Sequence, residues 1–129
     1  MNAVLDVSAM DTSAGRSIQL ATWNVNSLKV RLPHLLQWLE NNPVDLLGLQ
    51  ELKLTDENFP TAELQAAGYG AVFAGQKTYN GVAILYKLAT MPQPQVVLIN
   101  LPSFPDEQKR VIAATFGDLR FISAYVVNG

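Results

Sequence analysis

The sequence contains no cysteine and only one histidine, His34, which falls in the first turn of a predicted helix. Disulfides and thiolate metal sites are therefore excluded, and the lack of cysteine is typical of a reducing, cytoplasmic location. No apolar run approaches the ~18 residues of a membrane-spanning helix, so we expect no membrane partner. Residues 1–17 lack the basic start and apolar core of a signal peptide, and we interpret them as a flexible tail.

The sequence also lacks a large excess of either acidic or basic residues. Eleven acidic residues and nine basic residues give a net charge of −2. Charged residues make up 16% of the 129 residues and hydrophobic residues 49%, which indicates a globular chain that forms one domain or a portion of a larger one. The chain lacks the strongly basic balance that is usual for nucleic-acid binding, although a local basic patch remains compatible with this composition.

The most informative segment is an apolar run, residues 44–49, that ends in the polar pair Gln50 and Glu51. Leucines on both sides of this run predict a central strand that is buried on both faces. In open α/β sheets, ligands gather beyond the carboxyl ends of the strands. Glu51 is therefore a candidate metal ligand or base, and it is equally compatible with an ordinary strand end.

The segment before this run predicts a parallel neighbour for it. Residues 18–24 alternate between apolar and polar side chains, which predicts a strand. Leucines at helical spacing over residues 32–42 predict a helix that begins near Pro33, because proline is tolerated in a first helical turn. The order strand, helix, strand implies a parallel pair with a right-handed crossover. Asn24 and Glu51 are therefore expected at the same edge of the sheet.

The remaining sequence predicts further short elements without an internal repeat. We expect a helix over residues 61–67, strands over 69–75 and 81–87, an irregular loop or edge over 91–105, and a hairpin formed by 110–116 and 119–127.

Oxygen-bearing side chains near the predicted strand ends are the main candidates for chemistry. Magnesium takes oxygen ligands and often uses only one or two protein carboxylates, which fits Glu51 with the Asn24 carbonyl beside it. Asn24 also fits a turn, Lys53 a solvated lysine, and Tyr125 a core aromatic. The mixture of Lys77, Tyr79 and Asn80 is compatible with nucleic acid or with a simple hairpin. No glycine-rich phosphate loop or Ser/His/Asp set is present, so catalysis by a nucleophilic side chain has no support.

Four motifs taken in order resemble the exonuclease–endonuclease–phosphatase superfamily, and within it the exodeoxyribonuclease III and abasic-site endonuclease family. They are Thr-Trp-Asn-Val-Asn-Ser-Leu at 22–28, Leu-Leu-Gly-Leu-Gln-Glu-Leu-Lys at 46–53, Gly-Gln-Lys-Thr-Tyr-Asn-Gly at 75–81 and Tyr-Val-Val-Asn-Gly at 125–129. The third motif separates the DNA repair enzymes from lipid phosphatases and sphingomyelinases. The resemblance implies an α/β fold in which residues 18–129 are the N-terminal half of a four-layered α/β sandwich, one mixed sheet with flanking helices.

The resemblance also implies roles for individual residues. Glu51 matches a Mg²⁺ or Mn²⁺ ligand, Asn24 an asparagine of the metal and phosphate site, and Tyr125 a tyrosine that approaches the scissile phosphate. The implied partner is double-stranded DNA with abasic sites or 3′ ends. Positions on or near the implied DNA-binding face are Asn26, Lys53, Lys77, Tyr79, Asn80 and Arg110. One departure is Val127, where the family usually has proline.

A second departure is the absence of residues that the family carries in its other half. These are an Asp-x-Asn pair, a later aspartate and a near-terminal Asp-His pair, so we expect essentially no turnover by this chain alone. We also expect its one sheet to expose an apolar inner face, which would favour association. Two alternatives remain open. The chain could be a non-catalytic fragment or pseudogene product that needs a partner chain, or another phosphodiesterase or phosphatase of the superfamily.

Overall fold

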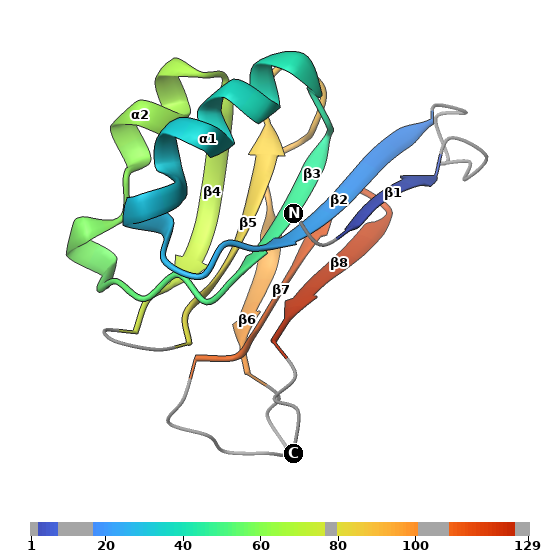
Figure 1. The fold of residues 1–129 in the computed structure, drawn as a ribbon. Coiled ribbons are helices and arrows are strands. Elements are labelled where there is room, and N and C mark those ends of the chain that lie inside the picture. The colour runs from blue at the N-terminus through green and yellow to red at the C-terminus, as the bar shows by residue number, and fades with distance from the viewer. Residues whose placement is uncertain (1–2, 8–16, 77–79, 101–108, 126–129) are drawn as a thin grey trace.

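The computed structural model describes residues 3–7, 17–76, 80–100 and 109–125. Within these ranges, a larger and a smaller β-sheet lie face to face, with helices outside the larger one (Figure 1). None of the described helices is long and apolar enough to cross a membrane. The elements in chain order are β1 (Ala3–Val7), β2 (Ile18–Asn24), α1 (Leu28–Asn41), β3 (Leu46–Gln50), a 3₁₀ turn η1 (Asp56–Asn58), α2 (Thr61–Ala66), β4 (Tyr69–Ala74), β5 (Val82–Lys87), β6 (Gln95–Ile99), β7 (Val111–Phe116) and β8 (Leu119–Ala124).

The larger sheet is the mixed sheet that the sequence predicted. Its strand order is β1-β2-β3-β5-β4, and β2 and β3 are the parallel pair, with Asn24 opposite Gln50. All five residues of β3 are buried. Leu47 and Leu49 pack in the core beneath the helices, while Leu46 packs in the core on the opposite face. The prediction of a central strand that is covered on both faces is confirmed.

Helix α1 begins at Leu28, so the expected start near Pro33 is wrong. Pro33 lies within the helix and cannot donate to the carbonyl of Lys29, which is an exposed residue whose carbonyl can bond water instead. The start of the helix is fixed by the neighbouring loop. The backbone N–H groups of Ser27 and Leu28 donate to the carbonyls of Glu51 and Leu52, each at 2.9 Å. Tertiary hydrogen bonds thus satisfy donors that a helix start leaves unpaired.

The structure also differs from our expectation within the predicted tail. Ala3–Val7 forms strand β1, which pairs antiparallel with β2 from Ala3 opposite Thr22 to Val7 opposite Ile18. An open edge of β2 would leave a row of backbone groups unpaired, and β1 supplies partners for them. Residues 8–16 lie outside the described ranges. The division into a tail and a domain at residue 18 stays a prediction.

The expected open inner face is covered in the structure, so that expectation is wrong. Strands β6, β7 and β8 form a second antiparallel sheet in that order. We expected an irregular loop or edge over residues 91–105, where β6 lies at the edge of this sheet, and β7 and β8 form the expected hairpin. Ile112 and Phe116 of β7 pack against Leu46 and Ile84 of the larger sheet. The described chain therefore contributes strands to both sheets of the sandwich, with α1 and α2 on the far side of the larger sheet (Figure 1).

Apolar exposure is found on the smaller sheet instead. All five residues of β6 are exposed, and Val96 reaches 67% exposure. Ile122 of β8 is 56% exposed. Strand β6 is an edge strand, so its exposed apolar side chains accompany backbone groups that can pair with another strand.

Candidate active site

The candidate site lies where the parallel strands β2 and β3 end. The loops that follow them continue side by side, because the Val25 N–H donates to the Gln50 carbonyl at 3.0 Å. Asn24 ends β2 and Glu51 directly follows β3, and the Asn24 amide Nδ2 donates to Glu51 Oε1 at 3.0 Å. The predicted meeting of Asn24 and Glu51 at one sheet edge is confirmed.

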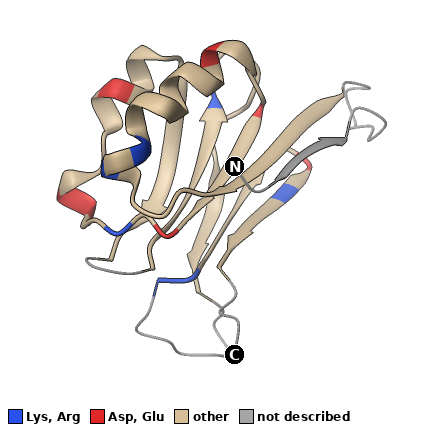
Figure 2. Ribbon diagram, in the orientation of Figure 1, with Lys and Arg blue, Asp and Glu red and all other residues tan. Residues whose placement is uncertain are grey.

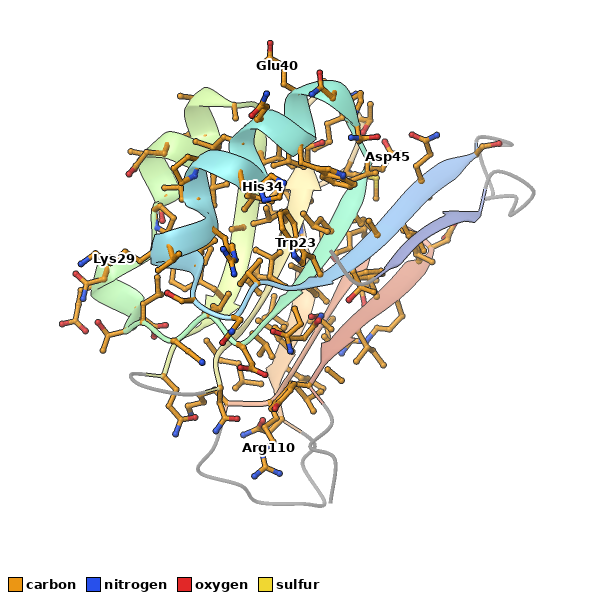
Figure 3. The ribbon with its side chains drawn as sticks, viewed as in Figure 1. Trp23, Lys29, His34, Glu40, Asp45 and Arg110 are labelled. Carbon is orange, nitrogen blue, oxygen red and sulfur yellow. The ribbon has the colours of Figure 1, made fainter. Side chains whose placement is uncertain are left out.

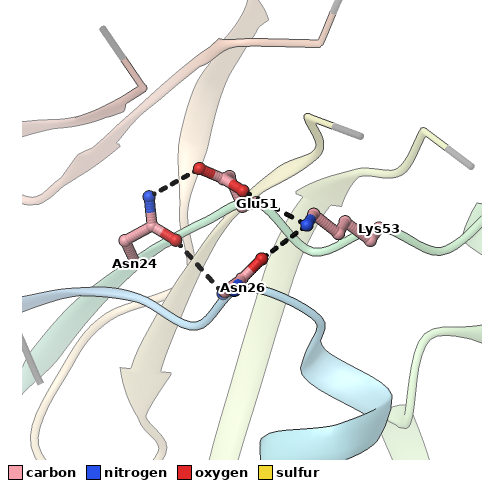
Figure 4. A network of polar contacts seen from close by, with 4 residues as sticks. All are labelled: Asn24, Asn26, Glu51 and Lys53. Carbon is pink, nitrogen blue, oxygen red and sulfur yellow. Dashed lines mark hydrogen bonds and ion pairs between the residues drawn. The ribbon is translucent and has the colours of Figure 1, made fainter. Parts of the chain in front are cut away.

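Hydrogen bonds extend from this pair to the two flanking loops (Figure 4). Asn24 Oδ1 accepts from the Asn26 backbone N–H at 3.1 Å. The Lys53 ammonium donates to Asn26 Oδ1 and lies 3.6 Å from Glu51 Oε2. The four side chains therefore form one connected network in which a single carboxylate faces an ammonium and an amide.

The surroundings of Glu51 favour its ionised form. The hydrogen bond from Asn24 lowers the pKa of Glu51, and a hydrogen bond from Tyr125 and the charge of Lys53 act in the same direction, while burial opposes them. The same hydrogen bond to Glu51 raises the pKa of Tyr125, with Arg110 acting weakly against it. Glu51 is therefore a carboxylate at neutral pH, and Tyr125 is a neutral phenol whose hydroxyl donates a hydrogen bond to Glu51.

Unusual backbone conformations gather at this edge. Left-handed φ angles are uncommon for residues other than glycine and cost on the order of 1–3 kcal/mol each, and they concentrate at functional sites. Backbone hydrogen bonds between the loops hold them here, such as Lys53 N–H to the Asn80 carbonyl at 3.1 Å. The site loops contain five such residues: Asn26 (+47°), Ser27 (+92°), Glu51 (+55°), Lys53 (+55°) and Asn80 (+63°).

Basic residues lie around the site although the chain as a whole is slightly acidic. Figure 2 shows that the charged residues occupy helices, loops and strand ends, with few on the sheets. A groove of about 620 Å³ beside the site is lined by Lys29, Lys53 and the acidic Glu63 among others. Arg110 lies at the same end, because its carbonyl accepts from the Tyr125 N–H at 2.8 Å. Figure 3 shows Arg110 opposite the end that carries Glu40 and Asp45.

Most of the predicted site residues are brought together by the structure. Asn24, Asn26, Glu51, Lys53 and Tyr125 are linked by the contacts above. Asn80 and Arg110 border them through backbone hydrogen bonds. Tyr125 follows β8 and contacts Glu51, so the alternative of an ordinary core aromatic does not describe it. Lys77 and Tyr79 lie outside the described residues.

Three buried or half-buried polar residues behind the site were not predicted. Gln50 Nε2 donates to Thr22 Oγ1 at 2.8 Å and to Ser123 Oγ at 3.0 Å. Ser123 Oγ donates to the Leu49 carbonyl at 3.1 Å. Gln50 was recognisable as a polar residue that ends an apolar strand, but its partners are 28 and 73 residues away in sequence.

Comparisons with known proteins show the family to which the chain belongs. Residues 21–126 match the endonuclease/exonuclease/phosphatase family. Exodeoxyribonuclease III of Haemophilus influenzae is 36% identical over 118 residues, which are 87% of this chain and 42% of that protein. A solved 3′ phosphatase from Neisseria, bound to a product DNA hairpin, is 52% identical with a TM-score of 0.81, over 88% of this chain and 43% of the other.

A third relative is an AP endonuclease from Archaeoglobus fulgidus. It is 39% identical with a TM-score of 0.75, and the match covers 83% of this chain and 40% of the other. The chain thus spans less than half the length of the proteins that it matches. The family match and the shared α/β sandwich confirm the resemblance found in the sequence motifs, and the chain belongs to the endonuclease/exonuclease/phosphatase family.

Proposed function

We propose that this chain supplies one side of the active site of a Mg²⁺-dependent DNA repair nuclease of the exodeoxyribonuclease III type. The observation that carries the proposal is the ionised Glu51 carboxylate, held by Asn24 and Tyr125 at the edge where β2, β3 and β8 end. Membership of the family and the DNA-related names of its relatives support the same reaction class.

The side-chain oxygen atoms at this edge fit a divalent metal ion, although they would supply only some of its ligands. Glu51 would bind the ion through a carboxylate oxygen, and Asn24 would add its amide oxygen or orient the carboxylate. The described residues include no group of three or more His, Cys, Asp or Glu side chains that could hold a metal. A hard cation that keeps water and substrate phosphate as its other ligands suits such a site, and Mg²⁺ or Mn²⁺ is the proposed ion. An ion held there would supply polarisation of the phosphate and stabilisation of charge on the leaving oxygen.

The chain's own residues have separate roles in this proposal. Tyr125 keeps its hydroxyl proton, so this hydroxyl is a neutral hydrogen-bond donor at the site. Asn24 holds Glu51 in place through its hydrogen bond. Lys53 lies beside both Glu51 and the adjacent groove, where its charge suits a phosphate of the DNA backbone. The remaining proposed DNA-binding residues are Asn26, Lys77, Tyr79, Asn80 and Arg110.

The proposed substrate is double-stranded DNA with an abasic site or a 3′ end. Among the relatives, one solved structure is named a 3′ phosphatase and another an AP endonuclease. We propose that turnover needs the segment of the domain that this chain lacks relative to those proteins. Loss of a general base alone typically costs about 10²–10⁴-fold in rate.

A second candidate function is that of a non-catalytic chain that acts only with a partner. The exposed apolar residues of β6 favour this alternative, since an open apolar edge strand is a ready surface for association. We use the term complete domain for this chain joined to the missing segment. The first candidate function predicts that the complete domain cleaves DNA, and the second predicts that it does not.

The test is cleavage of defined DNA by the complete domain. Duplexes with one abasic site, and duplexes with a 3′ phosphate, should both be assayed with Mg²⁺, with a chelator, and after restoring Mg²⁺. We expect cleavage that stops with the chelator and returns with the metal, and no measurable turnover by the 129-residue chain alone. A complete domain that leaves both substrates intact would refute the proposed function. Robust turnover by the short chain would refute the need for the missing segment.

A further inference from the structure

A buried hydrogen-bond network lies directly behind the Asn24–Glu51–Tyr125 site. Gln50 and Ser123 are 6% and 2% exposed. The Gln50 amide nitrogen donates to Thr22 Oγ1 on β2 and to Ser123 Oγ on β8. A glutamine amide has two N–H donors, so these two bonds use both of them. The network thus joins β2, β3 and β8, which are the three strands that end at the site.

Each strand in this network carries a site residue just beyond its network residue. Successive side chains of a strand point to opposite faces, so residues two apart share a face. Thr22 and Asn24 therefore share the inner face of β2. In the same way, Ser123 on β8 and Tyr125, which directly follows β8, lie on one face. Gln50 immediately precedes Glu51 in the chain. A shift of any of the three strands at the network would therefore move a side chain of the site.

Gly48 allows the two sheets to approach closely at this point. A Cβ atom on Gly48 would lie 3.0 Å from Ser123 Oγ and 3.1 Å from Ser123 Cβ. Because glycine leaves this space open, the Ser123 hydroxyl reaches both the Leu49 carbonyl and the Gln50 amide. The smaller sheet is thus anchored to β3 by side-chain hydrogen bonds one or two residues before Glu51.

We propose that Gln50 is a positioning residue whose side-chain amide, by bridging Thr22 and Ser123, sets the relative placement of Asn24, Glu51 and Tyr125. Gln50 acts through these neighbours and touches no reacting atom in this proposal. The inference deepens the proposed function of the same site, and its relevance to catalysis rests on that function. The relative placement of the three side chains can be measured without any reaction. Failure of the positioning role is therefore distinguishable from failure of the proposed function.

The test uses the 129-residue chain with 3-fluorotyrosine incorporated only at position 125, followed by ¹⁹F NMR at slightly acidic pH. The Glu51→Ala variant supplies the reference shift for a Tyr125 ring that has lost its contact with Glu51. Gln50→Leu removes both bridging bonds, and we expect it to move the Tyr125 resonance by at least half of that reference shift. The backbone amide spectrum of each variant shows whether the fold is retained.

A matched pair at position 22 keeps the test decisive if Gln50→Leu does not fold. Thr22→Val has nearly the same shape as threonine but removes the hydroxyl that accepts from Gln50, whereas Thr22→Ser keeps a hydroxyl. We expect Thr22→Val to shift the Tyr125 resonance in the direction of the Glu51→Ala reference and Thr22→Ser to leave it unchanged. Folded Thr22→Val with the wild-type resonance, or equal shifts in both variants, would overturn the positioning role.

Discussion

Replacing Glu51 with glutamine should reduce cleavage of abasic DNA by the complete domain at least about 100-fold, since changes to groups that merely support a metal ligand typically cost 10–100-fold. The glutamine side chain has nearly the same size but no charge. It would present a neutral amide to the metal ion and leave the Lys53 ammonium, now 3.6 Å from Glu51 Oε2, without its carboxylate. The loss should appear mainly in kcat at saturating Mg²⁺.

A variant with the same change of charge controls for long-range electrostatics. Glu40→Gln removes one carboxylate from the exposed side of α1 near the opposite end of the molecule (Figure 3). We expect this variant to cleave DNA at nearly the wild-type rate, and both variants to bind DNA with similar affinity by fluorescence anisotropy. Near-wild-type cleavage by Glu51→Gln would rule out Glu51 as a metal ligand.

The second large effect concerns β3, the strand that Glu51 directly follows. Leu49→Ala should lower the free energy of unfolding by about 2–5 kcal/mol, the range found when a buried leucine is truncated. Leu49 is 0% exposed and lies in the core beneath the helices, opposite Trp23 on β2 and Ala83 on β5. Because β3 lies between β2 and β5, the surrounding structure has little room to collapse into the cavity that the truncated side chain would leave. Guanidinium unfolding followed by circular dichroism measures the change.

An exposed aliphatic residue provides the matched comparison. Val30 on α1 is 65% exposed, and alanine is a better helix former than valine. Val30→Ala should therefore leave the unfolding free energy unchanged or raise it slightly. If Leu49→Ala were as stable as Val30→Ala, β3 could not be the central strand described above.

Local sequence patterns predicted the central strand and the parallel strand pair. The apolar run at residues 44–49 predicted a strand buried on both faces, and the strand–helix–strand order predicted that Asn24 and Glu51 meet. The start of α1 was missed because the rule for Pro33 is local. The bonds from Ser27 and Leu28 to the loop after β3 are tertiary and override it.

The second sheet and the network behind the site depend on long-range contacts. Strand β6 is a short, mostly apolar segment that follows Pro92 and Pro94, and it is a strand through its pairing with β7. Gln50, Thr22 and Ser123 come from three separate segments, and no periodicity links them. The roles of Tyr125 and Arg110 were inferred from the family resemblance rather than from spacing. Their contact with the site follows from how the smaller sheet packs on β3.

Metal binding at Glu51 is the central claim, and its most direct measurement is paramagnetic broadening by Mn²⁺ in the ¹⁵N,¹³C-labelled 129-residue chain. Signals of Asn24, Glu51 and Tyr125 should lose intensity first as Mn²⁺ is added. Asp45 at the other end of the β3 segment is buried, and its signals should persist (Figure 3). The selective loss should vanish in Glu51→Gln. Broadening that is uniform, that centres on another carboxylate, or that is unchanged in Glu51→Gln would contradict metal binding at this site.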